Sequence, residues 1–110
     1  MIRDTLGKIE TKIQKADSIQ EEKKTELLDL LSTLKTEIAE LSKTHGDQAQ
    51  SIASFTEISA HEATREAKNP QLLRLALEGL SSSVNGFESS HPKLVQIVNS
   101  FCVTLSNLGI

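Results

Sequence analysis

The chain has 110 residues and a mass of 12.0 kDa, and we expect residues 1–110 to form one domain, because domains typically contain about 100 to 150 residues. Its net charge is −3 and its pI is near 5.6, so it lacks the cationic surface with which proteins bind nucleic acids or acidic membranes. With three Phe and neither Trp nor Tyr, its core must be aliphatic.

Cysteine content and the first residues bear on the compartment. Cys102 is the only cysteine, so no disulfide can form within the chain, which fits a reducing environment. Four of the first ten residues are charged, and they interrupt the apolar run that a secretory signal requires. We therefore expect a cytoplasmic protein without a membrane segment.

Charge is distributed unevenly along the chain. Residues 1–68 carry 23 of the 27 charged side chains, whereas residues 92–110 carry only Lys93. Apolar residues in that last segment are too numerous to be left in water when they can be buried. The segment is therefore expected at the centre of the fold or of an assembly.

Apolar residues recur at alternating spacings of four and three, which predicts helices throughout, and no strand-like alternation is present. The first helix is expected over residues 2–16. The second is expected to begin near Ile19, because Ser18 and Glu21 have the spacing of a capping box.

The second helix is predicted to continue as one long central helix over residues 19–68. Its apolar register includes two polar positions, His45 and Gln48, and is otherwise apolar. The register consists of Leu27, Leu31, Leu34, Ile38, Leu41, His45, Gln48, Ile52 and Phe55. Such a helix would be roughly 75 Å long. In the alternative interpretation, Gly46 ends this helix and Asp47 caps a new one.

Two cap-and-proline pairs predict the remaining helices, over residues 70–87 and 92–108. Asn69 precedes Pro70, and His91 precedes Pro92. Proline is favoured at the first helical position, where its missing N–H costs no hydrogen bond. These two helices would form a C-terminal helical hairpin.

Three segments of the chain resemble a known family. They are ADSIQEEKKTELLDLLSTLKTEI, KNPQLLRLALEGL and FESSHPKLVQIVNSFCVTLSNLGI, and they are similar to a family of small bacterial proteins called domain of unknown function 4404. The resemblance implies a bacterial, soluble, helical protein. It implies no activity and no catalytic or binding residues.

Few residues are candidates for chemistry. Glu57 and His61 share a helix face. His61 and Glu62 also begin an HE pair, but Arg65 stands where the HExxH motif of zinc proteases needs its second histidine. Cys102 lies between apolar neighbours, which favours a buried structural role over a nucleophile. His45 falls in the apolar register, where a polar side chain can fix the register of a helix pair or sense pH.

The sequence therefore predicts an all-α antiparallel bundle with coiled-coil-like packing, one long central helix and a C-terminal hairpin. We expect a non-enzymatic protein without cofactors or metals that forms a homo-oligomer or binds a protein partner. The alternative is a bundle that binds a small ligand or metal through the charged face around Glu57 and His61. The residues expected to carry self-assembly, or to close the core, are Leu73, Leu77, Leu80, Val84, Leu94, Val98, Phe101, Leu105 and Leu108.

Overall fold

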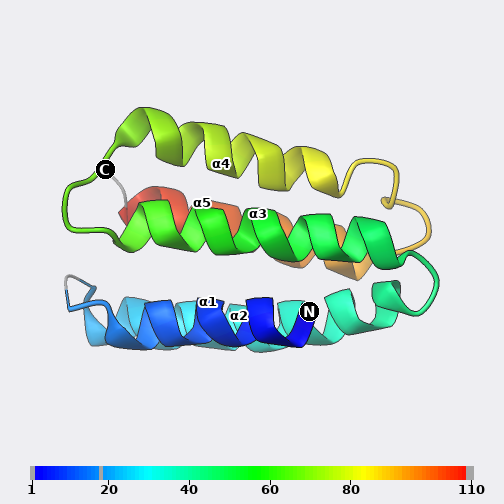
Figure 1. Cartoon of the computed structure of the whole chain (residues 1–110), viewed down its shortest axis with the longest axis horizontal. Coiled ribbons are helices and arrows are strands. Elements are labelled where there is room, and N and C mark those ends of the chain that lie inside the picture. The colour runs from blue at the N-terminus through cyan, green and yellow to red at the C-terminus, as the bar shows by residue number, and fades with distance from the viewer. Residues whose placement is uncertain (1, 18, 109–110) are drawn as a thin grey trace.

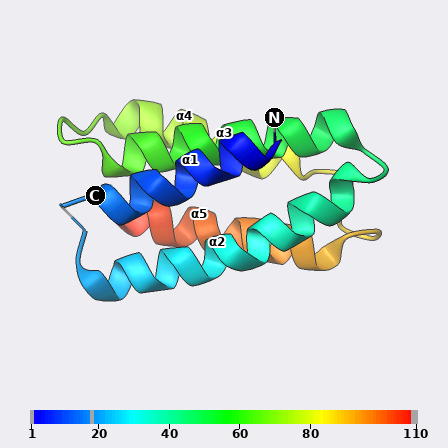
Figure 2. The same ribbon diagram turned by 60° about the horizontal axis from the view of Figure 1, so that its bottom comes forward.

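Five helices make up the computed structural model, which describes residues 2–17 and 19–108 (Figure 1). They are α1 (Ile2–Lys15), α2 (Glu21–Ser42), α3 (Gly46–Thr64), α4 (Pro70–Ser83) and α5 (Pro92–Leu108). The described residues contain no strand, so the all-α prediction is confirmed. Each helix runs in the opposite direction to the one before it, as the two views show (Figures 1 and 2).

The helix α3 occupies the centre of the molecule. Its backbone comes close to those of all four other helices, and within the described residues no other helix does this. In Figure 1, α1 and α4 flank α3 on its two sides, and α2 and α5 lie behind them. The arrangement is therefore three helices packed over two.

The residues that α3 buries are mostly small, as a helix surrounded by neighbours requires. The distance between two packed helix axes depends on the side chains at the contact, so small residues permit a closer approach. The buried residues of α3 are Ala49, Ile52, Ala53, Thr56, Ser59, Ala60, Glu62 and Ala63. The surrounding helices contribute the larger Leu and Ile side chains.

The predicted long central helix is wrong, because the chain turns between α2 and α3. The last carbonyls of α2 accept hydrogen bonds from local groups: Thr44 N and His45 N donate to Leu41 O at 3.1 and 2.8 Å, and Ser42 Oγ donates to Ala39 O at 2.7 Å. Such bonds satisfy the unpaired carbonyls at a helix end. The turn also lets both halves bury their apolar faces in a molecule whose longest dimension is 37 Å.

The other helix ends differ less from the prediction. The N-cap of α2 is Gln20, without a side-chain capping bond, and the expected capping residue Ser18 lies outside the described residues. At the start of α4, Asn69 Oδ1 accepts a hydrogen bond from Leu72 N at 3.1 Å, which is the expected cap. This helix ends at Ser83, four residues earlier than predicted, and a turn at Gly86 with φ +96° follows it. The bounds of α5 coincide with the predicted ones.

One cluster of buried apolar side chains joins all five helices. Phe101 on α5 has no exposed surface, and Leu94, Val98 and Leu105 on the same helix are equally buried. The segment with a single charge therefore forms part of the chain's own core. Among the described residues, no helix is both long and apolar enough to cross a membrane.

Replacing Phe101 with Ala should destabilise the monomer strongly. The side chain is fully buried, so truncation leaves a cavity and should lower the free energy of unfolding by about 3–5 kcal/mol. The matched control is Val103→Ala on the same helix, because Val103 is 60% exposed and surface changes cost about 0.5 kcal/mol or less. Urea unfolding followed by circular dichroism measures both. Equal midpoints for the two variants would contradict the packing of α5.

Candidate interaction surface

Most of the residues expected to carry assembly lie inside the single chain. Seven of the nine are buried, and Leu77 and Leu108 are partly buried against the same core. A partner could reach the seven buried side chains only by opening the bundle. The exposed apolar side chains of the folded chain are other residues.

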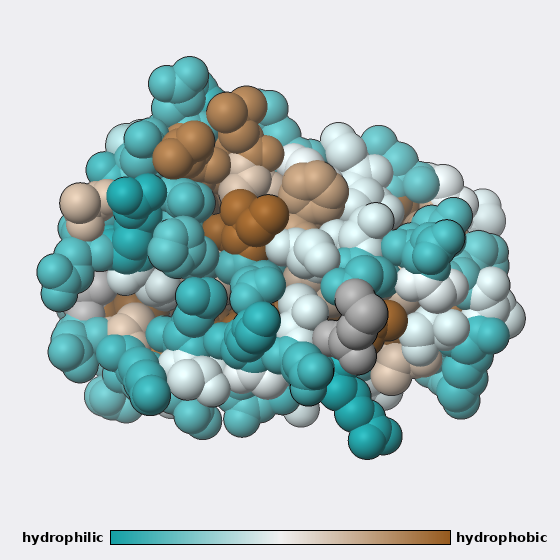
Figure 3. Space-filling model, viewed as in Figure 1, coloured by the Kyte–Doolittle hydropathy of each residue, from teal (hydrophilic) through white to brown (hydrophobic). Residues whose placement is uncertain are grey.

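A patch of exposed apolar side chains lies across α3 and α4. It consists of Phe55 and Ile58 on α3 and Leu72 and Leu75 on α4, whose exposed fractions are 36%, 48%, 42% and 53%. Hydrophobic surface gathers over these two helices in the space-filling view (Figure 3). We call these four residues the α3–α4 patch. Val103 on α5 is the other large apolar side chain with comparable exposure among the described residues.

The patch forms because α3 and α4 each carry large apolar side chains outside their buried positions. On α3, Phe55 and Ile58 lie three residues apart on a side that the neighbouring helices cover only in part. On α4, Leu73, Ala76 and Leu80 point into the core, so Leu72 and Leu75 project outward.

The absence of a side chain at Gly79 leaves room for the Phe55 ring. A Cβ atom at Gly79 would lie 2.4 Å from Phe55 Cε1, well inside van der Waals contact. The ring therefore lies directly against the backbone of α4. This contact places the α3 side of the patch next to α4.

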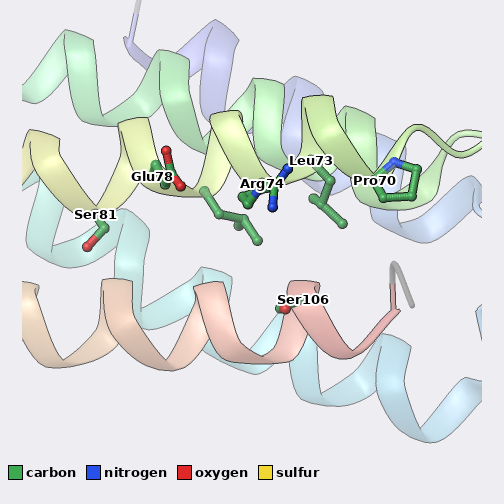
Figure 4. Close-up of a pocket in the computed structure, with 7 residues that line it drawn as sticks. Pro70, Leu73, Arg74, Glu78, Ser81 and Ser106 are labelled. Carbon is green, nitrogen blue, oxygen red and sulfur yellow. The ribbon is translucent and has the colours of Figure 1, made fainter.

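A groove runs along the other side of α4, between α4 and α5 (Figure 4). Its volume is about 450 Å³, and it is lined by Pro70, Leu73, Arg74, Leu77, Glu78, Ser81 and Ser106. Leu73 points from α4 toward α5, and Arg74 and Glu78 lie one turn apart along α4 (Figure 4). Within the described residues, neither Arg74 nor Glu78 forms a hydrogen bond or an ion pair, so both charges are available to another molecule.

In the charged face around Glu57 and His61, the polar contacts are made by Glu62. His61 Nε2 lies 3.9 Å from Glu62 Oε2, and Arg65 Nη1 donates to Glu62 Oε1 at 3.0 Å. No hydrogen bond or ion pair joins Glu57 to His61 or to Arg65 in the described part of the chain. That part also contains no group of three or more potential metal ligands from His, Cys, Asp and Glu.

The other two histidines meet at one end of the bundle. His45 precedes α3 and His91 precedes α5, and their rings lie edge to face with a centroid distance of 6.4 Å. Phe87 contacts both rings, at 5.4 Å from His45 and 5.7 Å from His91. The prediction of His45 within a continuous helical register is wrong, because the helix is interrupted there. These rings instead join the α2–α3 turn to the α4–α5 turn.

Cys102 is partly buried on α5. Desolvation raises the pKa of its thiol from the usual value of 9.0 to about 11. Because the thiolate is the reactive form, this environment disfavours a nucleophilic cysteine. The position agrees with the structural role expected from the sequence.

Cys102 should react slowly with a thiol reagent in the folded protein. The raised pKa lowers the thiolate fraction at pH 8 about 100-fold relative to an ordinary thiol, so the native rate should be lower by at least that factor than the rate in denaturant. Between pH 8 and 10 the native rate should rise about tenfold per pH unit. Stopped-flow absorbance with an aromatic disulfide measures both rates. Equal native and denatured rates would contradict the burial of this thiol.

Sequence reasoning missed the α3–α4 patch, although a signal for it was present. It placed Phe55 in a buried register that continued across Gly46, and it counted only one seam on α4. The segment from Pro70 to Leu80 contains five leucines, more than one seam of a helix can hold. The surplus leucines, Leu72 and Leu75, are the exposed ones.

No curated protein and no solved structure matches this chain. The model of the family described as domain of unknown function (DUF4404) matches residues 27–110, which include most of α2 and all of α3, α4 and α5. The patch and the groove beside it both lie within the matched residues. Since the match covers well over half of the chain, and agrees with the resemblance of the three segments, this protein belongs to the DUF4404 family.

Proposed function

We propose that the protein is non-enzymatic and acts by self-assembly, and that the α3–α4 patch is the surface through which copies of the chain associate. The observation that carries the proposal is the clustering of four large apolar side chains, each between 36% and 53% exposed, on two adjacent helices. Protein interfaces commonly have such an apolar centre with a polar rim. Arg74 and Glu78 supply charged groups beside it.

The remaining features fit a binding role better than catalysis. The one cysteine has a raised pKa, and no hydrogen bond or ion pair joins Glu57 to His61 within the described residues. A net charge of −3 disfavours nucleic acid as the partner, because such binding depends on neutralising phosphates. The unpaired cysteine fits a cytoplasmic protein, since reducing conditions keep thiols free.

The molar mass in solution should be at least twice 12.0 kDa at micromolar concentration, as measured by light scattering after size exclusion. Replacing Ile58 or Leu75 with Asp should shift the mass toward that of the monomer, because each change puts a charge into the centre of the apolar contact. Both side chains are about half exposed, so the variants should remain folded, which circular dichroism checks.

The matched control is Val103→Asp, which makes the same chemical change at an exposed valine on α5. Its mass should equal that of the unmodified chain. The proposal fails if the unmodified protein is monomeric at micromolar concentration, or if the two patch variants associate as strongly as the control.

A further inference from the structure

Arg74 and Glu78 are the only charged residues of α4, and they lie four residues apart. Both are exposed, and neither has a partner within the described residues. Their order also disfavours pairing along the helix, because at this spacing an acidic residue stabilises better when it precedes the basic one. The helix therefore presents one positive and one negative charge that its own chain leaves unpaired.

These two charges are complementary to a second copy of the same helix. In a two-fold interface, if residue i of one copy contacts residue j of the other, then j also contacts i. When two copies of α4 lie antiparallel and cross at Ala76, which is midway between the charges, each Arg74 faces the Glu78 of the second copy. Both charges of each copy are then paired at once.

The α3–α4 patch is centred on the same turn of α4. Leu75 is next to Ala76 in sequence, and Phe55 lies against Gly79, three residues beyond it. The two-fold axis of such an antiparallel pair lies in the plane of the interface and perpendicular to the two helices. Each edge of one copy therefore meets the same edge of the other copy. The apolar edge of one copy would thus meet the apolar edge of the other, while the two charged edges would meet along the groove side.

We infer that two copies of this chain pair through antiparallel α4 helices about a two-fold axis near Ala76, with Leu75 and the rest of the α3–α4 patch in apolar contact and with reciprocal Arg74–Glu78 ion pairs. The inference rests on the proposed function and specifies its geometry. The apolar patch supplies most of the affinity, and the two ion pairs fix the antiparallel register, since charges at the edge of an interface contribute mainly to specificity.

Charge reversal tests this geometry. Arg74→Glu alone and Glu78→Arg alone should each raise the dimer dissociation constant by about tenfold to a hundredfold, because two attractive contacts become repulsive in the symmetric dimer. The double variant R74E/E78R should return to within about threefold of the unmodified chain, since it exchanges the two charges and restores both pairs. Sedimentation equilibrium over a dilution series measures the constants.

Mixing the two single variants gives a sharper result. The two carboxylates of the Arg74→Glu variant would then face the two guanidinium groups of the Glu78→Arg variant. An equimolar mixture should therefore form a heterodimer that is more stable than the homodimer of either variant. Lys93→Glu is the control for net charge, because this exposed residue lies on the groove between α2 and α5. Its dissociation constant should stay within about threefold of the original.

The outcomes separate the two proposals. A monomeric unmodified protein overturns both. If the protein associates and Ile58→Asp weakens it, but the charge reversals leave the constant unchanged or the double variant fails to recover, the antiparallel α4 geometry is wrong and the proposed function stands. If neither the patch variant nor the charge reversals weaken association, the chain assembles through another surface, and both are overturned. Circular dichroism of each variant verifies that it is folded.

Discussion

The close packing of four helices around α3 is the constraint on which the rest of the structure depends. A helix with neighbours on so many sides has little room for its own side chains, and the buried positions of α3 are accordingly occupied mainly by Ala, Ser and Thr. Helix axes pack at about 8–10 Å when the contact residues are of ordinary size, and small residues allow the lower end of that range. The core of this chain is thus divided between a slim central helix and neighbours that carry Leu and Ile.

This division explains how an aliphatic chain with three Phe residues forms a core. Large side chains from α1, α2, α4 and α5 fill the space that the small residues of α3 leave, with Phe101 the largest fully buried one. It also explains the surface. The four neighbours cover one arc of α3 only in part, and Phe55 and Ile58 lie on that arc. The same packing that closes the core therefore leaves two large apolar side chains outside it.

The sequence predicts some of these features correctly because they depend on local chemistry. Asn69 and Pro70 define the start of α4, and Pro92 defines the start of α5, since proline and the preceding cap act within one turn of the chain. The low charge of the last segment identifies α5 as a core helix, because burial of so many apolar side chains is favoured in any compact arrangement.

The turn that interrupts the predicted long central helix could not be predicted in this way. Periodicity continued across Gly46, but of His45, Gln48, Ile52 and Phe55 only Ile52 is buried. Two polar residues in a row of the register already indicated an interruption. Whether a polar interruption becomes a turn depends on what the two halves bury when they fold back on each other, and that is a property of the whole bundle. The α3–α4 patch as a whole likewise exists only once α3 and α4 lie side by side, although the surplus leucines of α4 were visible in the sequence.

A comparison of α4 with the other helices shows why two of its leucines stay exposed. α5 also has apolar residues on more than one side, but it contacts α2, α3 and α4; Val95 and Cys102 are partly covered, and Val103 is the one large apolar side chain of its described residues that stays exposed. α1 has only two neighbouring helices, as α4 does, but its outer face is charged. α4 alone among the described helices combines two neighbours with an outward face that carries Leu72 and Leu75. Its apolar surface exceeds what its own chain can cover, and the remainder is the part available to another copy.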